Sequence, residues 1–224
     1  MKVAALYDVH AMHHALAAVL DELADVGPDL ILFGGDLIGG PFPRETVELA
    51  RSVDARFLRG NGEREPDAWD RAHLAPEVLD ELARDPVQLS VDGVLYCHAA
   101  PDSDLTLTTA STPVGALEHS FGGCVEELVV IGHTHHQFDL TAGAHRIVNA
   151  GSVGMAYEGE VAAFWALLED GTPVFRKTPF DIERAAAEIE ASGWPGAAEF
   201  VAENLRATPS RAEAIEHFER LRAA

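Results

Sequence analysis

The stretch KVAALYDVH at residues 2–10 decides the fold, because it joins an apolar run directly to two polar residues. KVAALY has the length and composition of a buried β-strand, and the run stops at Asp8 and His10. Rigid strand ends and the loops beyond them are where open α/β sheets build functional sites. Apolar residues then recur at helical spacing over 13–26, and Gly27-Pro28 ends that helix. The opening therefore predicts a strand, a polar loop and a helix.

The same unit repeats along the first half of the chain. LILF at 30–33 is a second predicted strand, and the glycine-rich loop GGDLIGGPFP leads from it to a helical pattern at 44–53. ARFL at 55–58 is a third predicted strand, which runs into RGNGERE. Strands that alternate with helices in this way predict an α/β fold with a largely parallel first sheet.

The second half of the chain is rich in predicted strands. Helical patterns near 66–84 precede a predicted hairpin, in which strands at 87–91 and 94–97 turn at Asp92-Gly93. Further strands are predicted at 127–132, 138–141, 145–149, 161–168 and 173–177. This density of strands predicts a second, mixed sheet that packs on the first.

Three amphipathic helical patterns follow Asp181, separated by Gly-Trp-Pro and Thr-Pro-Ser. We predict one domain over residues 1–180 and a C-terminal helical extension over 181–224 that packs on it. We favour an extension that packs on the domain or forms a homodimer. The alternative is a lid over a functional site.

The composition excludes several classes of function. Among 224 residues, 37 are acidic and 16 are basic, which gives a net charge of −21. A surface this acidic repels a nucleic-acid backbone, so we expect no nucleic-acid partner. No apolar run reaches the roughly 18–20 residues of a membrane span, and two cysteines are too few for a disulfide framework. We therefore expect a cytoplasmic protein with no membrane partner.

Polar side chains of a few types follow the ends of five predicted strands. They are Asp8, His10, Asp36, Asn61, His98, His133 and His135. Carboxylate, imidazole and amide oxygen together suit divalent manganese, iron, zinc, nickel or cobalt. Bound ions of this kind would also supply the local positive charge that a phosphate-bearing substrate needs in so acidic a chain.

The ordered motifs D-x-H, G-D, G-N, H and G-H-T-H resemble those of the calcineurin-like metallophosphoesterase superfamily, over residues 1–150 or more. The resemblance implies a four-layer αββα sandwich of two mixed sheets flanked by helices, which makes residues 1–180 a metallophosphoesterase domain. It also implies two divalent transition-metal ions, with manganese as the first candidate. Carried over by position, one ion is bound by Asp8, His10 and His135 and the other by Asn61, His98 and His133, and Asp36 bridges them.

The resemblance further implies the reaction. A hydroxide that bridges the two ions attacks a small phosphomonoester or phosphodiester in line, without a covalent intermediate. Catalytic roles then fall to Asp36, Asn61, His98 and His135 among the ligands. The expected partner is a small phosphorylated substrate.

The third motif departs from the family pattern in a way that affects this chemistry. Many members have G-N-H-[DE], in which the histidine protonates the leaving group or stabilises the transition state, whereas this chain has Gly62 there. Glycine has no acid group, so poor leaving groups should be hard to expel. His14, His136 and Arg64 are the candidate replacements, and Glu63 and Arg64 are expected to orient Asn61 or to pair with each other.

Other readings of these residues remain open. Asp8 and Asp36 are also suitable helix caps, and Asn61 alone would suit a turn. His13, His73, His119, His145 and His217 are predicted to lie on the surface or on helix faces. A second functional hypothesis is a metal-binding interaction scaffold of the same fold with little hydrolytic activity. A third is a nuclease, which the net charge disfavours.

Overall fold

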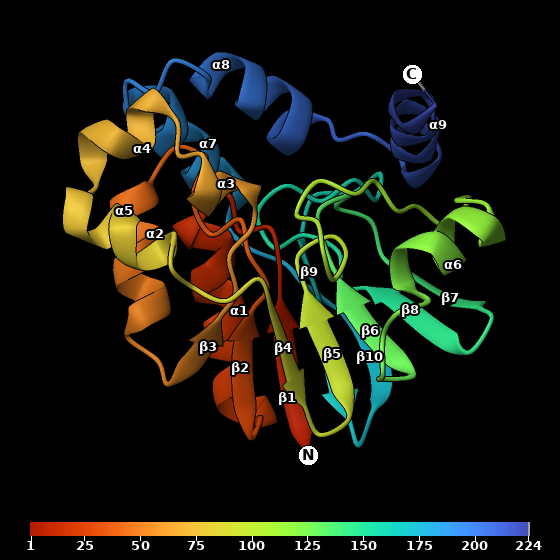
Figure 1. Cartoon of the computed structure of the whole chain (residues 1–224). Helices are drawn as coiled ribbons and strands as arrows, with labels where there is room; N and C mark the ends of the chain where they lie inside the picture. Colours follow the sequence, from red (N-terminus) through yellow and green to blue (C-terminus); the bar gives the residue numbers. More distant parts are fainter. Residues whose placement is uncertain (224) are drawn as a thin grey trace.

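Two five-stranded β-sheets pack face to face, and helices cover their outer sides (Figure 1). They are seen in a computed structural model of the chain, which describes residues 1–223. Within these residues no helix is both long enough and apolar enough to cross a membrane. The predicted αββα sandwich of two mixed sheets is confirmed.

The first sheet has the strand order β10-β9-β1-β2-β3. Strands β1, β2 and β3 run parallel. At the β1 edge, β9 pairs antiparallel with β1, and β10 pairs antiparallel with β9. The bounds are β1 Lys2–Leu6, β2 Leu30–Phe33, β3 Ala55–Phe57, β9 Ala163–Glu169 and β10 Thr172–Thr178.

The second sheet has the order β4-β5-β6-β8-β7. Its three central strands run parallel, and the edge strands β4 and β7 are antiparallel to their neighbours. The bounds are β4 Gln88–Val91, β5 Val94–Cys97, β6 Leu128–Ile131, β7 Phe138–Ala142 and β8 His145–Asn149. The predicted hairpin at Asp92-Gly93 is confirmed, and both of its turn residues have positive φ.

The helices form the two outer layers. Those on the first-sheet side include α1 His13–Val26, α2 Pro43–Arg51, α4 Ala68–His73, α5 Pro76–Leu82 and α7 Ile182–Ala191. On the second-sheet side, α6 Val114–Phe121 covers the face. The remaining elements are the short helix α3 Asn61–Arg64 and, in the extension, α8 Ala197–Phe200, the π-helix η1 Val201–Arg206 and α9 Arg211–Arg222.

Strand β1 is apolar at every position after Lys2 because both faces of the first sheet are covered. Ala4 and Leu6 pack against the helices, with Leu16 of α1 among their neighbours in that core. Val3 and Ala5 point the other way, into the core between the two sheets. This arrangement explains why KVAALY reads as a continuous apolar run rather than an alternating one.

Two helices, α3 and α6, have no counterpart in the sequence-based prediction. Helix α3 has only four residues, too few to show an apolar period. Helix α6, VGALEHSF, contains a glycine and lies close to Gly122 and Gly123, so its intrinsic helix propensity is low. Burial of Leu117 and Phe121 against the second sheet stabilises it instead.

Candidate metal centre

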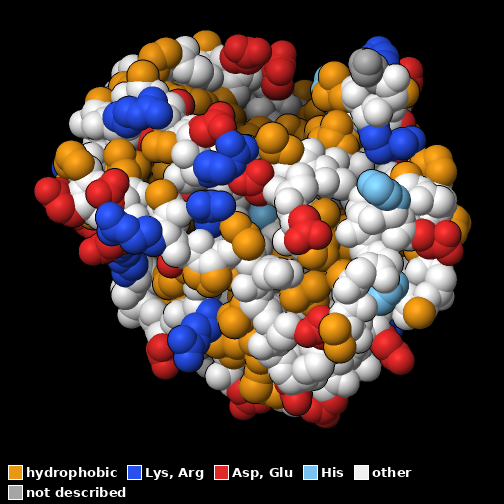
Figure 2. Space-filling view, viewed as in Figure 1, with side chains coloured by type: hydrophobic (Ala, Val, Ile, Leu, Met, Phe, Trp, Pro, Cys, Tyr) orange, Lys and Arg blue, Asp and Glu red, His pale blue; other side chains and the backbone are white. Residues whose placement is uncertain are grey.

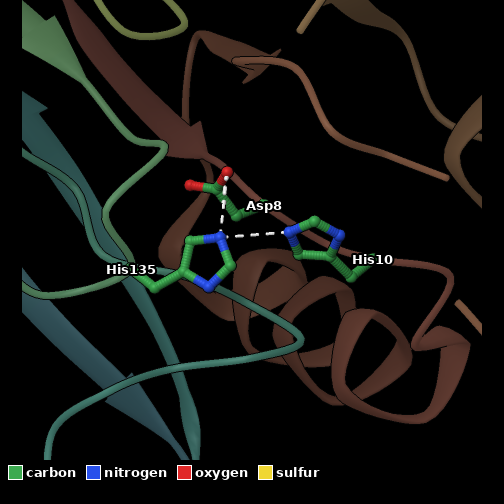
Figure 3. Close-up of side chains that lie close together, drawn as sticks. All are labelled: Asp8, His10 and His135. Carbon is green, nitrogen blue, oxygen red and sulfur yellow. Dashed lines mark hydrogen bonds and ion pairs between the residues drawn. The ribbon is translucent and has the colours of Figure 1, made fainter. Parts of the chain in front are cut away.

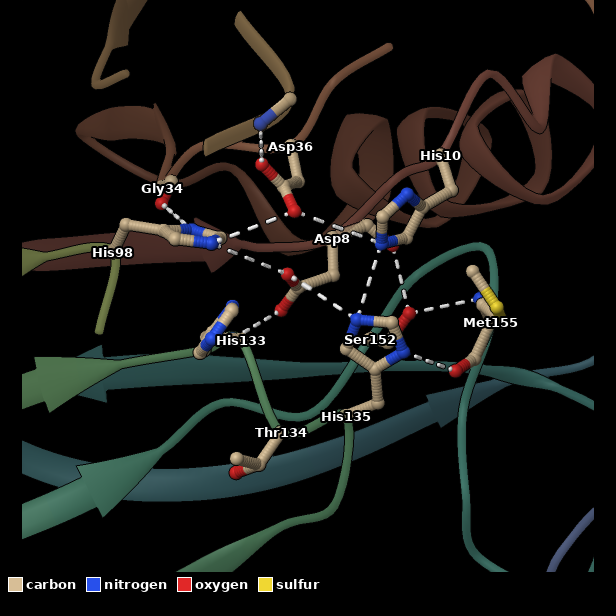
Figure 4. A network of polar contacts seen from close by, with 12 residues as sticks. Asp8, His10, Gly34, Asp36, His98, His133, Thr134, His135, Ser152 and Met155 are labelled. Carbon is tan, nitrogen blue, oxygen red and sulfur yellow. Dashed lines mark hydrogen bonds and ion pairs between the residues drawn. The ribbon is translucent and has the colours of Figure 1, made fainter. Parts of the chain in front are cut away.

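The ends of β1, β2, β5 and β6 bring six of the seven predicted ligands together at one edge of the two sheets (Figure 4). Backbone hydrogen bonds join the loop after β1 to the loop after β2. Asp8 N donates to Gly35 O at 3.1 Å, and His10 N donates to Asp36 O at 2.9 Å. In the second sheet, Gly132 N donates to His98 O at 2.8 Å. Loops far apart in sequence are thus fixed side by side by their main chains.

Five of the predicted ligands have left-handed backbone conformations. The φ angles are 52° at Asp8, 47° at His10, 53° at Asp36, 68° at His133 and 56° at His135. Among residues 1–223 only eight residues other than glycine have positive φ. Each such residue costs on the order of 1 kcal/mol, and strain of this kind concentrates at functional sites.

Asp8, His10 and His135 form the first cluster (Figure 3). One ligand atom from each lies within 4.8 Å of the other two. His135 Nε2 lies 3.5 Å from Asp8 Oδ1 and 3.1 Å from His10 Nε2. These separations suit three donors around a single ion.

Asp36, His98 and His133 form the second cluster, and their ligand atoms also lie within 4.8 Å of one another. Asp36 Oδ2 lies 3.5 Å from His98 Nε2 in this cluster and 3.9 Å from His10 Nε2 in the first. A single carboxylate oxygen therefore faces both clusters, as a bridging ligand must. Asn61, the seventh predicted ligand, begins α3 between Gly60 and Gly62.

Hydrogen bonds behind the ligands orient them. His98 Nδ1 donates to Gly34 O at 3.1 Å, and His135 Nδ1 donates to Met155 O at 2.8 Å. Because a carbonyl only accepts, each ring carries a proton on Nδ1 and turns its Nε2 toward the cluster. Backbone N–H groups hold the carboxylates. His133 N donates to Asp8 Oδ2 at 2.8 Å, and Gly62 N donates to Asp36 Oδ1 at 2.7 Å.

Several buried side-chain oxygen and nitrogen atoms at the centre have no hydrogen-bond partner among the described residues. They are Asp8 Oδ1, Asn61 Oδ1, His98 Nε2 and His10 Nδ1. Buried polar atoms without a partner are rare in folded proteins. All four belong to atom types that bind divalent transition metals, and they lie on residues of the two clusters or at Asn61. The donor set therefore fits two cations.

The family model of the calcineurin-like phosphoesterase superfamily domain matches residues 1–170. The chain belongs to this superfamily. Membership supports a metal-dependent phosphoesterase in general terms. No curated protein matches the chain.

Solved structures share the fold. A metallophosphoesterase from Sphaerobacter thermophilus is 24% identical, with 92% of this chain and 99% of that chain covered and a TM-score of 0.77. A hypothetical protein from Pyrococcus horikoshii OT3 is 19% identical, with 91% and 98% covered and a TM-score of 0.78. A putative diadenosine tetraphosphatase is 17% identical, with 79% and 93% covered and a TM-score of 0.55. At these identities the likeness shows the fold alone.

The charges of the clustered side chains depend on one another. Burial disfavours the ionised form of Asp36, but His98 and His10 beside it hold its pKa well below the usual range. Burial likewise opposes protonation of His98, yet Asp36 and Asp8 raise the pKa of His98 to about 10. Burial and the neighbouring His98 lower the pKa of His133 to about 4. A proton on His98 thus balances the carboxylates, and a bound cation would displace it.

Glu63 is a positioning residue whose contacts the sequence did not predict. Its side chain is 2% exposed and accepts hydrogen bonds from the backbone N–H groups of Asp36, Leu37 and Gly60, at 2.9, 2.6 and 2.8 Å. It therefore ties the loop after β2 to the loop after β3. The expected pairing of Glu63 with Arg64 is wrong, because Arg64 instead pairs with Asp104 at 2.6 Å and with Glu65. The available signal was the position of Glu63, three residues after the helix cap Gly60.

Two glycines before ligands allow close approach of the chain to the carboxylates. A Cβ at Gly60 would lie 2.3 Å from Asp36 Oδ1, and a Cβ at Gly132 would lie 2.4 Å from Asp8 Oδ2. The carboxylates of Asp36 and Asp8 thus occupy the space that a Cβ at these two positions would need.

The three candidate replacements for the family's missing histidine are all engaged by other groups of the protein. His136 is fully buried, its Nδ1 bonds to Thr134 O, and burial lowers its pKa to about 4. Arg64 is held by Asp104, which raises its pKa further. His14 Nε2 is engaged by Glu188 Oε2 at 2.8 Å. Position 62 itself contributes only its backbone N–H, to Asp36.

Proposed function

We propose that the protein is a phosphoesterase that hydrolyses a small phosphomonoester or phosphodiester at a dinuclear centre. The observation that carries the proposal is the place of Asp36 Oδ2, which faces both three-residue clusters. Asp8, His10 and His135 would hold one ion, and His98, His133 and Asn61 the other. Two ions bound there lower the pKa of a water molecule and polarise the phosphoryl group.

The protein's own contribution is orientation. Gly34 O and Met155 O fix the rings of His98 and His135, and Glu63 fixes the backbone that carries Asp36. These groups hold the ligands in place before substrate binds, so little reorganisation is needed during the reaction. Strained φ angles at five ligands support the same view, because such strain persists only where the surrounding structure enforces it.

Two cavities beside the centre suit the parts of a substrate. One, of about 320 Å³, is lined by His98 together with Arg59 and Arg64. Arg59 offers guanidinium N–H groups to the anionic part of a substrate, whereas Arg64 is already paired with Asp104, which lines the same cavity. Figure 2 shows basic and acidic side chains interspersed on the left half of this face.

The larger cavity, of about 670 Å³, lies between η1 and α9. Its wall includes Tyr157, whose ring packs 4.9 Å from the ring of His135, and Phe218 of α9. Figure 2 shows a hollow at the top of the molecule with hydrophobic side chains on its floor. The organic part of the substrate would fit there, so the extension would restrict substrate size.

The proposal is tested with a series of aryl and alkyl phosphodiesters that differ in the acidity of the leaving alcohol. Because Gly62 provides no proton, we expect kcat/KM for manganese-loaded protein to fall steeply as the leaving group becomes poorer. An alkyl ester should react at least about 100-fold more slowly than a nitrophenyl ester, the contribution of a general acid. The uncatalysed hydrolysis of the same esters is the reference slope.

The outcomes separate the functional hypotheses. A slope much flatter than the reference would mean that another residue protonates the leaving group. Negligible turnover of every ester under every metal would favour the interaction scaffold instead. A strong preference for DNA over all small esters would favour a nuclease.

A further inference from the structure

A third group of candidate metal ligands lies outside the dinuclear centre. His13 and His14 are the first two residues of α1, and Glu188 lies on α7 in the C-terminal extension. One ligand atom from each residue lies within 4.8 Å of the other two. The group shares no residue with the two clusters described above, so it is a separate site.

The contacts within this group fix its donors. His14 Nε2 lies 2.8 Å from Glu188 Oε2, while Glu188 Oε1 accepts a hydrogen bond from Arg184 Nε at 2.7 Å. The rings of His13 and His14 pack with their centroids 3.8 Å apart. The ring of Phe42 packs edge-on against both imidazoles, with its centroid 4.9 Å from that of His13 and 5.5 Å from that of His14.

Within the group, the imidazole of His14 is more deeply buried than the carboxylate of Glu188. The side chain of His14 is 6% exposed, whereas that of Glu188 is 40% exposed. Phe42 therefore shields one side of the imidazoles, and the carboxylate side stays open to solvent. A cation from solution has access through that side without rearrangement of the core.

The imidazoles of His13 and His14 are not satisfied within the protein. The Nδ1 atoms of both rings are buried and have no hydrogen-bond partner among the described residues. A neutral imidazole has one N–H and one lone pair, so each ring leaves one of these groups unused in the protein interior. Two unpartnered imidazole nitrogens on rings whose centroids lie 3.8 Å apart are unusual. They indicate that a component of the site is a bound ligand.

We propose that His13, His14 and Glu188 bind a third divalent cation, for which zinc is the best-suited ion, and that this cation fastens α7 to α1. Two imidazoles and one carboxylate are an established zinc donor set, with water as the fourth ligand. The nearby Glu45 adds negative charge that favours a cation. Arg184 is the nearby positive charge, and it is already paired with Glu188. Because α7 belongs to the extension, the ion joins residues that are 174 positions apart.

The consequence is a link between the extension and the helix that directly follows the His10 loop. The surrounding contacts are otherwise modest, since α7 buries only Ala185, Ala186 and Ile189. An ion that binds the folded state and not the unfolded one stabilises the protein by mass action. Zinc should therefore raise the melting temperature of the wild-type protein beyond the effect of filling the dinuclear centre.

The first test is the zinc content of saturated protein after removal of free metal. We expect about three zinc ions per chain for the wild type and about two for Glu188→Gln, which keeps the size of the side chain but removes its charge. Glu190→Gln is the matched control, because Glu190 is exposed on the same helix, and it should bind as much zinc as the wild type. Equal zinc contents for the wild type and Glu188→Gln would overturn the proposal.

A second test needs no variant. Diethyl pyrocarbonate modifies accessible imidazoles, and mass spectrometry of peptides reports which ones. We expect zinc to slow the modification of His13, which is only partly buried, but not that of His119, which is exposed on α6. Equal modification of His13 with and without zinc would overturn the proposal. Both readouts are independent of phosphoesterase activity, so failure of the proposed function would not affect them.

Discussion

Replacement of Asp36 by asparagine is expected to lower kcat/KM on a nitrophenyl phosphodiester by about 1000-fold or more, on the order of 4 kcal/mol of transition-state stabilisation. Asp36 Oδ2 faces His10 and His98 at 3.9 and 3.5 Å, so the variant removes a negative charge that both clusters share. The bound metal should fall together with the activity. Metal content and steady-state kinetics measure the two effects.

The matched control for this variant is Asp139→Asn. Asp139 is paired with Arg146 on the surface of the second sheet, at 2.6 Å, and takes no part in the centre. Its replacement should leave metal content and kcat/KM within about twofold of the wild type, since surface ion pairs contribute little. If Asp36→Asn also kept its metal and its turnover, Asp36 would not be the bridging ligand.

The second large effect is expected at Glu63, which binds no metal in this account. Glu63→Gln places an amide N–H₂ group where the carboxylate accepts hydrogen bonds from the backbone N–H groups of Asp36 and Gly60. Buried donors that lose their acceptor should cost about 2–4 kcal/mol of unfolding free energy. Because the loop that carries Asp36 is then less well held, kcat should also fall about 10–100-fold.

Chemical denaturation and kinetics on the same preparations check this prediction. Glu216→Gln on the exposed face of α9 is the control, and it should change neither quantity. A merely structural role for Glu63 would lower stability without lowering kcat of the folded protein. A stable Glu63→Gln with wild-type kinetics would mean that the three hydrogen bonds do not position Asp36.

Much of the fold could be predicted because the strands are apolar runs that end abruptly in polar residues. KVAALY, LILF and LVVI are buried strands, and Asp8, Asp36 and His133 follow them closely. Parallel strands place their carboxyl ends at one edge of a sheet, so the convergence of these residues followed from topology. Their sorting into two clusters followed only from the resemblance to the superfamily.

Other features depend on tertiary contacts that a sequence pattern does not contain. Helix α6 has weak intrinsic propensity and exists because Leu117 and Phe121 are buried. Glu63 looked like a partner for its neighbour Arg64, whereas its partners are backbone N–H groups that only the folded loops bring near. His13 was predicted as an ordinary helix-face residue, because Glu188 lies far away in the sequence.

The most direct test of the dinuclear account is a manganese titration of metal-free protein carrying Glu188→Gln, which removes the third group of ligands. Bound metal and hydrolysis of bis(nitrophenyl) phosphate are followed in the same samples. The account predicts about two manganese ions per chain, with full turnover reached only when the second ion is bound. Binding of less than one ion per chain, or equal hydrolysis by the metal-free protein, would contradict it.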